Sequence, residues 1–191
     1  YSLALSIWLI FRASGTAGSG RDSTVTFSIV GMCERTATAG VAITTSSISV
    51  GSRCPWVRAG AGAVATQNVT DPSIGNEMLD LMAQGADAPA ALAAVMDGRL
   101  FAEYRQVTAV DLRGNIAERT GTEILGTHAV SHGSQCVAAG NLLSSTQVPG
   151  AMTEGFSRHA DLHLAERLLC AIEAGVAAGG EEGPTHSAAL L

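Results

Sequence analysis

From Thr26 onward the sequence alternates strand-forming and turn-forming segments, and this alternation constrains the fold more than any other feature. One strand pattern covers residues 26–30, a turn follows, and a second strand pattern covers residues 40–47. The 25 residues before Thr26 contain no methionine and fit no domain of their own. We therefore expect a leader over residues 1–25 and a single domain over residues 26–191.

The remaining elements follow in the order expected of sheets covered by helices. Asp71 or Ser73 would cap a first helix, and Asp87 would cap a second one with Pro89 in its first turn. The expected elements are a strand at 61–67, helices at 72–84 and 87–96, a hairpin of 106–111 and 116–120, a strand at 137–142, helices at 145–156 and 162–177, and a last strand from 187. This order predicts an α+β fold with helix layers outside antiparallel sheets.

Composition limits the partners that such a domain would bind. The chain has 191 residues and a net charge of −6, and the balance of 47% hydrophobic to 15% charged residues is typical of a globular domain. Nucleic-acid binding needs a basic patch with stacking aromatics, whereas here the arginines are scattered and aromatics are few. We expect a small-molecule substrate, neutral or cationic rather than polyanionic. Neither nucleic acid nor a membrane is an expected partner. The sequence leaves open whether the protein forms a homo-oligomer.

Cysteine and histidine spacing favours no bound metal. The cysteines are Cys33, Cys54, Cys136 and Cys170. They lie far apart without the paired spacing of a zinc site, so free thiols in a reducing compartment are favoured over disulfides. Two histidine pairs, at 128/132 and 159/163, have chelating spacing but no third ligand at a recognisable distance. We therefore expect no metal, and nothing implies an organic cofactor.

The segment before Thr26 has two interpretations. All 11 basic residues are arginine, as in a GC-rich reading frame, and Val25 is what a GTG start codon gives when translated literally. In the favoured interpretation, residues 1–24 are translated upstream sequence that packs little onto a cytoplasmic domain, with Trp8 and Leu9 outside its core. In the alternative, residues 1–20 are the remnant of a signal peptide of a secreted or periplasmic protein.

Several sequence blocks, in order, resemble the family called domain of unknown function 1028. They include Thr-Phe-Ser-Ile-Val at 26–30, Pro-Trp-Val-Arg-Ala-Gly at 55–60, Gly-Ala-Val-Ala-Thr-Gln at 62–67, Gly-Asn-Leu-Leu at 140–143 and His-Ser-Ala-Ala-Leu at 186–190. The resemblance implies an N-terminal nucleophile hydrolase fold, a four-layer αββα sandwich of two antiparallel sheets between helices. Family members usually begin Met-Thr-Phe-Ser-Ile-Val, which supports Val25 as the start. Relatives usually continue past Leu191, so we expect the domain to be truncated there.

An N-terminal threonine carries its own general base. A threonine hydroxyl is a weak nucleophile until a base takes its proton, and the α-amine of a terminal residue, with a pKa of about 8, lies within reach of its own hydroxyl. Removing Val25 would expose Thr26 in this way. The tetrahedral intermediate then needs preorganised donors, and polar residues at neighbouring strand ends would supply them. Those residues are Thr45, Ser46, Gln67, Asn68 and Asn141.

Each of these residues also has an ordinary structural explanation. Thr45 and Ser46 would suit the polar face of a strand, Gln67 and Asn68 would bond a turn, and Asn141 would cap one. We assign Thr26, Asn141 and Asn68 to catalysis, and Thr45, Ser46, Gln67 and Arg58 to substrate binding. Arg58 would hold a substrate carboxylate bidentately or else pair with a surface acid.

These residues predict an amidohydrolase that cleaves a small amide or lactam through a threonyl ester. The other interpretation is a catalytically silent binding or assembly protein on the same fold, because a fold does not determine a function.

Overall fold

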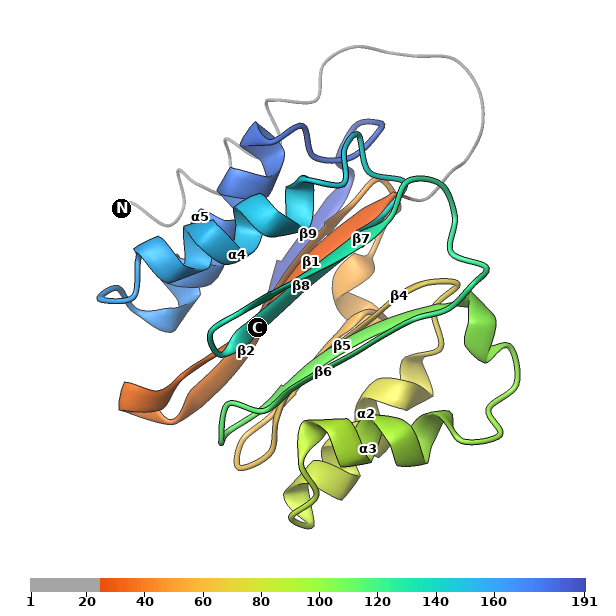
Figure 1. Ribbon diagram of the computed structural model, residues 1–191, viewed down its shortest axis with the longest axis vertical. Helices are drawn as coiled ribbons and strands as arrows, with labels where there is room; N and C mark the ends of the chain where they lie inside the picture. The colour runs from red at the N-terminus through yellow and green to blue at the C-terminus, as the bar shows by residue number, and fades with distance from the viewer. Residues whose placement is uncertain (1–24) are drawn as a thin grey trace.

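Two antiparallel sheets face each other between two pairs of helices in the computed structural model, which describes residues 25–191 (Figure 1). The first sheet has the order β7-β8-β1-β2-β9: Ala129–Gly133, Cys136–Asn141, Thr26–Cys33, Thr38–Thr45 and Ser187–Leu190. The second has the order β3-β4-β5-β6: Pro55–Arg58, Gly62–Asn68, Arg105–Asp111 and Ile116–Thr120. The predicted α+β class and its antiparallel sheets are confirmed.

Strand β1 is central because both of its faces are apolar. All eight of its residues are buried. Side chains alternate along a strand, so Phe27 and Ile29 pack against the helices that cover the first sheet, while Val30 and Met32 pack against the second sheet. The same alternation directs Thr26 and Ser28 toward the second sheet.

The helices form two outer layers (Figure 1). Helices α4 (Val148–Arg158) and α5 (Leu164–Ala177) cover the first sheet, and α2 (Pro72–Ala83) and α3 (Ala88–Met96) cover the second. The expected caps are present, since Asp71 accepts from the Ser73 amide and Asp87 from the Ala90 amide. Helix α4 begins three residues later than the predicted 145, because the segment before it forms a turn in which Ser145 accepts from the Gln147 amide.

Two edge strands and one strand extension were not predicted. Strand β3 has no counterpart among the expected elements, because it has only four residues and begins with a proline, which the ladder tolerates at an edge. Strand β7, at one edge of the first sheet, has five mostly polar or small residues without a strong apolar pattern. Strand β1 continues to Cys33, through Gly31, where a turn was predicted.

The expected leader, with Trp8 and Leu9, lies outside the described residues except for Val25, which is buried. Within residues 25–191, no helix is both long and apolar enough to cross a membrane.

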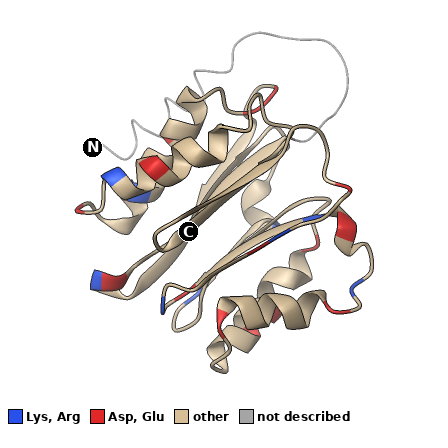
Figure 2. Cartoon of the chain, in the orientation of Figure 1, with Lys and Arg blue, Asp and Glu red and all other residues tan. Residues whose placement is uncertain are grey.

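The first sheet carries no charge of its own (Figure 2). Its five strands contain no Lys, Arg, Asp or Glu, and the charged residues lie on helices, loops and the second sheet. Any charged group acting at an end of this sheet must therefore come from a loop or from another element.

Candidate functional site

Three of the predicted site residues meet at one end of the first sheet. Thr26 opens β1, and its Cα partners are Thr45 at the end of β2 and Asn141 at the end of β8. The Thr26 side chain is 5% exposed, and its Oγ1 lies 3.0 Å from Oγ1 of Thr45. The candidate nucleophile is thus at a strand end, nearly buried, and in contact with a second hydroxyl.

The residue before Thr26 is held by the same groups. The Val25 carbonyl accepts from the Thr45 hydroxyl at 2.6 Å and from the Ser46 amide at 3.1 Å, while the Val25 amide donates to Ser46 Oγ at 2.9 Å. A hydroxyl has one hydrogen, and Thr45 gives it to Val25. The Thr26 hydroxyl therefore donates to Thr45, which makes Thr45 the acceptor beside the candidate nucleophile.

A second line of polar contacts connects the two sheets beneath Thr26. Ser28 donates to Gln67 Oε1 at 2.7 Å, and Gln67 donates to Gln106 Oε1, also at 2.7 Å. Asn141 donates to the same Gln106 oxygen at 3.3 Å, and its own Oδ1 is buried with no hydrogen-bond partner in the described chain. In this arrangement Asn141 presents an acceptor, whereas an oxyanion needs a donor.

Asn68 bonds a turn rather than Thr26, and Arg58 lies far from Thr26. Asn68 ends β4 with a φ of 71°, and its amide donates to the Tyr104 carbonyl and accepts from the Leu125 amide. It therefore shapes a turn. Arg58 pairs with Asp80 and lies opposite Gly62, at the far end of β4 from Asn68, about 20 Å away at roughly 3.3 Å per residue. The register of β3 against β4 separates Arg58 from the site.

The sequence interpretation missed Glu181. Its Oε1 accepts from the Thr185 hydroxyl at 2.6 Å, it takes a hydrogen bond from the Ser46 backbone, and its Oε2 has no partner in the described chain. Burial raises the pKa of Glu181 to about 7, against the opposing effect of these hydrogen bonds. Leu143, just after β8, forms an isolated bridge with Glu181 and so holds it near this end of the sheet. The only sequence signal was an acidic loop.

Three of the five histidines, the two below and His163, have local structural contacts. His128 and His159 each approach a nearby backbone carbonyl through Nδ1, at 3.0 and 2.8 Å, and His163 caps α5. In the part of the chain that the structure describes, no three His, Cys, Asp or Glu side chains gather as a metal site would require. All four cysteines are free thiols.

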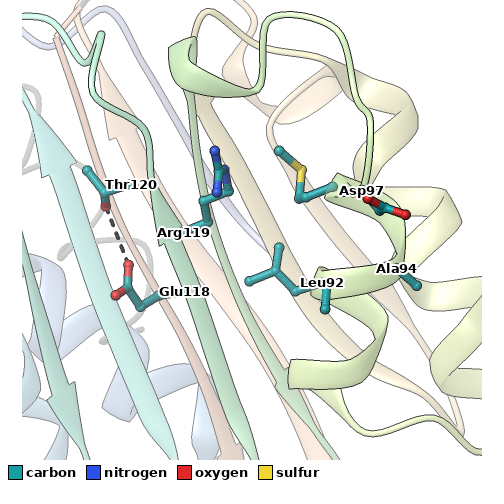
Figure 3. A pocket seen from close by; sticks show the side chains of 8 residues that line it. Leu92, Ala94, Asp97, Glu118, Arg119 and Thr120 are labelled. Atoms are coloured by element: carbon teal, nitrogen blue, oxygen red, sulfur yellow. Dashed lines mark hydrogen bonds between the residues drawn. The ribbon is translucent and has the colours of Figure 1, made fainter.

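A cavity of about 720 Å³ lies elsewhere, between α3 and β6 (Figure 3). Its lining includes Leu92, Asp97, Glu118, Arg119 and Thr120, and none of the predicted site residues. The Arg119 guanidinium is paired with Glu103 at 2.6 Å. The Thr120 hydroxyl in this cavity donates to Glu118 Oε2 in a long hydrogen bond of 3.4 Å, and Thr120 lies mid-chain without an amine of its own (Figure 3). We therefore place the candidate chemistry at the Thr26 end of the first sheet.

The fold and its strand-end threonine define an α+β protein of two antiparallel sheets covered by helices. Residues 26–191 match the model of the family of unknown function DUF1028, and the chain belongs to that family. A solved structure of the same family, protein SPO2555 from Silicibacter pomeroyi, is 34% identical and similar with a TM-score of 0.80, over 87% of this chain and 72% of that one. No curated protein matches the sequence.

Proposed function

We propose that this protein is an N-terminal nucleophile hydrolase that cleaves a small amide or lactam through Thr26. The observation that carries the proposal is the position of Thr26. It is the first residue of a central strand, with its hydroxyl 3.0 Å from Thr45 and with Asn141 as its other strand partner. Two antiparallel sheets between two helix layers also support the proposal, because the αββα sandwich that the family resemblance implies has such layers. We likewise propose a small-molecule substrate and a cytoplasmic location.

The Thr26 amine is a base only when the chain begins at Thr26. While Val25 is attached, the Thr26 nitrogen is an amide, which has no basic lone pair. Removal of the residues through Val25 would free an amine with a pKa of about 8. The unpartnered Oδ1 of Asn141, on the neighbouring strand, is a suitable acceptor for that amine.

The contacts of Val25 also indicate how an oxyanion would be stabilised. The Thr45 hydroxyl and the Ser46 amide now donate to the Val25 carbonyl, which is joined to Thr26. A substrate carbonyl attached to the Thr26 hydroxyl would lie close to the same place. These two groups would then donate to its developing negative charge, and losing one such donor costs about 10²–10³ in rate.

The reaction has two halves. The Thr26 amine takes the proton from Oγ1, and Oγ1 attacks the substrate carbonyl carbon to form the tetrahedral oxyanion. The C–N bond breaks as the amine passes its proton to the leaving nitrogen, which leaves a threonyl ester. A water molecule, deprotonated by the same amine, then hydrolyses the ester, releases the carboxylic acid and restores the hydroxyl.

The alternative is a catalytically silent binding or assembly protein. It is favoured by the buried Val25 and by the two hydrogen bonds that its carbonyl accepts, since a chain that keeps Val25 has no base on Thr26.

N-terminal mass spectrometry and a hydrolysis assay separate the two functions. The purified protein is expected to begin at Thr26 and to release p-nitroaniline from small acyl p-nitroanilides. Thr26→Ala should abolish release, while Thr26→Ser, which keeps a hydroxyl, should retain part of it. A protein that keeps Val25, or one that begins at Thr26 and hydrolyses no member of an amide and lactam panel, would favour the silent function.

A further inference from the structure

An arginine that was not singled out in the sequence lies close to Thr26. Arg53 follows the short 3₁₀ helix η2 (Val50–Ser52) and precedes β3. Its guanidinium donates to Ser47 Oγ and, at 3.2 Å, to Thr70 Oγ1. These hydroxyls fix a half-buried cation on the rim of the Thr26 end of the sheet.

Two hydroxyl groups connect this cation to Thr26. Ser47 Oγ lies 3.1 Å from Thr45 Oγ1, which in turn lies 3.0 Å from Thr26 Oγ1. Arginine is a donor only, so Ser47 Oγ accepts from Arg53, and the Ser47 backbone N–H donates to Thr45 Oγ1 at 3.2 Å. The guanidinium therefore lies three hydrogen bonds from the candidate nucleophile.

Arg53 lacks the acidic partner that five of the nine arginines in residues 25–191 have. Within residues 25–191, carboxylates pair with Arg58, Arg99, Arg113, Arg119 and Arg158. Arg53 forms no such pair there, although the chain has 17 acidic residues to 11 basic ones. Its hydrogen bonds to Ser47, Thr70 and the Cys54 sulfur use three of five N–H groups. A charge left without a counter-ion, with donors to spare, is suited to an anionic ligand.

We propose that Arg53 binds a carboxylate of the substrate, so that the amide cleaved at Thr26 belongs to an acidic molecule. This inference rests on the proposed function and assigns its substrate class. The overall charge of −6 favours a neutral or cationic ligand, but binding depends on the local field. Arg53 places a full positive charge on the rim of the Thr26 end, whereas burial raises the pKa of Glu181, at the same end, to about 7. The competing role for Arg53 is purely structural: it would hold Ser47 and Thr70 together through hydrogen bonds and bind no ligand.

Binding measured without turnover tests the assignment. A protein that begins at residue 26 and carries Thr26→Ala is titrated calorimetrically with N-acetylglycine, N-acetyl-β-alanine and N-acetyl-γ-aminobutyrate, and with the primary amide of each. At least one carboxylate is expected to bind at least about 10-fold more tightly than its amide, with an affinity that falls as salt is added.

Substitutions of Arg53 separate recognition of a substrate carboxylate from the purely structural role. Arg53→Met should weaken carboxylate binding by about 10- to 100-fold and leave amide binding unchanged. The carboxylate affinity of Arg53→Lys should lie between those of the unmutated protein and Arg53→Met, since lysine keeps the charge without the bidentate fork. Arg35→Met is the control. Arg35 also lacks a carboxylate partner in the described chain, but it lies just after the opposite end of β1, where it bonds the Asp161 and Leu162 carbonyls. Should Arg53→Met unfold the protein, Arg53→Lys carries the test.

Three results would overturn the proposal. In the first, the carboxylates bind no better than their amides, or do not bind at all. In the second, Arg53→Met weakens the binding of carboxylates and of amides by the same factor. In the third, Arg35→Met weakens carboxylate binding as much as Arg53→Met does. Turnover then distinguishes this failure from that of the proposed function. Neutral amides cleaved at Thr26 as fast as acidic ones would refute the role of Arg53 alone. Carboxylate binding that depends on Arg53, without hydrolysis of any acidic amide, would refute the hydrolase alone.

Discussion

The Thr45 hydroxyl donates to the Val25 carbonyl at 2.6 Å and accepts from the Thr26 hydroxyl at 3.0 Å. One side chain thus contacts both the group that would leave when Thr26 becomes terminal and the group that would then attack a substrate. Thr45 is itself fully buried, so its hydrogen bonds form away from bulk water, where they are strong.

Replacing Thr45 with valine, which has nearly the same shape, removes only the hydroxyl. For the protein that begins at Thr26, we expect kcat for amide hydrolysis to fall by about 10²–10³ with little change in KM, because the lost donor acts in the transition state. Thr44→Val is the control, since Thr44 is equally buried but lies on the opposite face of β2, with its hydroxyl 3.5 Å from Thr185. Equal losses in both variants would argue against Thr45 as an oxyanion donor.

The polar line between the sheets should contribute to stability. Gln67→Leu removes the bonds to Ser28 and Gln106 and leaves buried groups unpaired, so the free energy of unfolding should fall by about 2–4 kcal/mol in urea titrations. Gln84→Leu, at the exposed end of α2, should change it by less than about 0.5 kcal/mol. A Gln67→Leu protein as stable as the unmutated one would show that these bonds contribute little.

Glu181 should make stability fall as the pH rises. Its folded carboxyl, with a pKa of about 7, holds a proton more tightly than the unfolded one near 4.5, so the stabilisation is complete below about pH 4 and is lost through pH 7. Glu181→Gln should reduce the decline in unfolding free energy between pH 5 and pH 8 by about 2 kcal/mol. Glu173→Gln, on the exposed side of α5, should leave the decline intact. An unchanged slope in Glu181→Gln would mean that this carboxyl titrates normally.

Helix α2 lies against β3 through a glycine. A Cβ added at Gly75 would overlap the Trp56 ring, so Gly75→Ala should lower the free energy of unfolding by about 1–3 kcal/mol. Gly150 in α4 is the matched control, because a Cβ there meets nothing within 4 Å and alanine should stabilise the helix by about 0.5–1 kcal/mol. Urea titration of both variants checks the contrast, and a stable Gly75→Ala protein would require Trp56 to move easily.

Much of the fold could be predicted because its signals are local. Helices α2 and α3 begin at side-chain caps that are visible as Asp71 and Asp87, and strand β1 is an apolar run with a turn after it. Strands β3 and β7 were missed because edge strands bury little, so neither needs a strong apolar pattern.

The site was less predictable, because register and loop paths determine it. Thr45 and Asn141 could be named as polar strand ends, and the structure places both beside Thr26. Arg58 had the right chemistry, but the pairing of β3 with β4 sets it at the far end. Glu181 and Arg53 reach the site from loops, and no periodicity in the sequence reports where a loop returns to a sheet.

Acylation of Thr26 tests the central claim most directly. The protein that begins at Thr26 is incubated with a small β-lactone, which a nucleophile opens to an ester, the reaction is quenched with acid before the ester is hydrolysed, and the adduct is located by tandem mass spectrometry. We expect one acyl group, on Thr26, and none in Thr26→Ala or in a protein that retains Val25. An adduct on another residue, or equal labelling of Thr26 with Val25 still attached, would contradict the role of Thr26 as a nucleophile with its own amine as base.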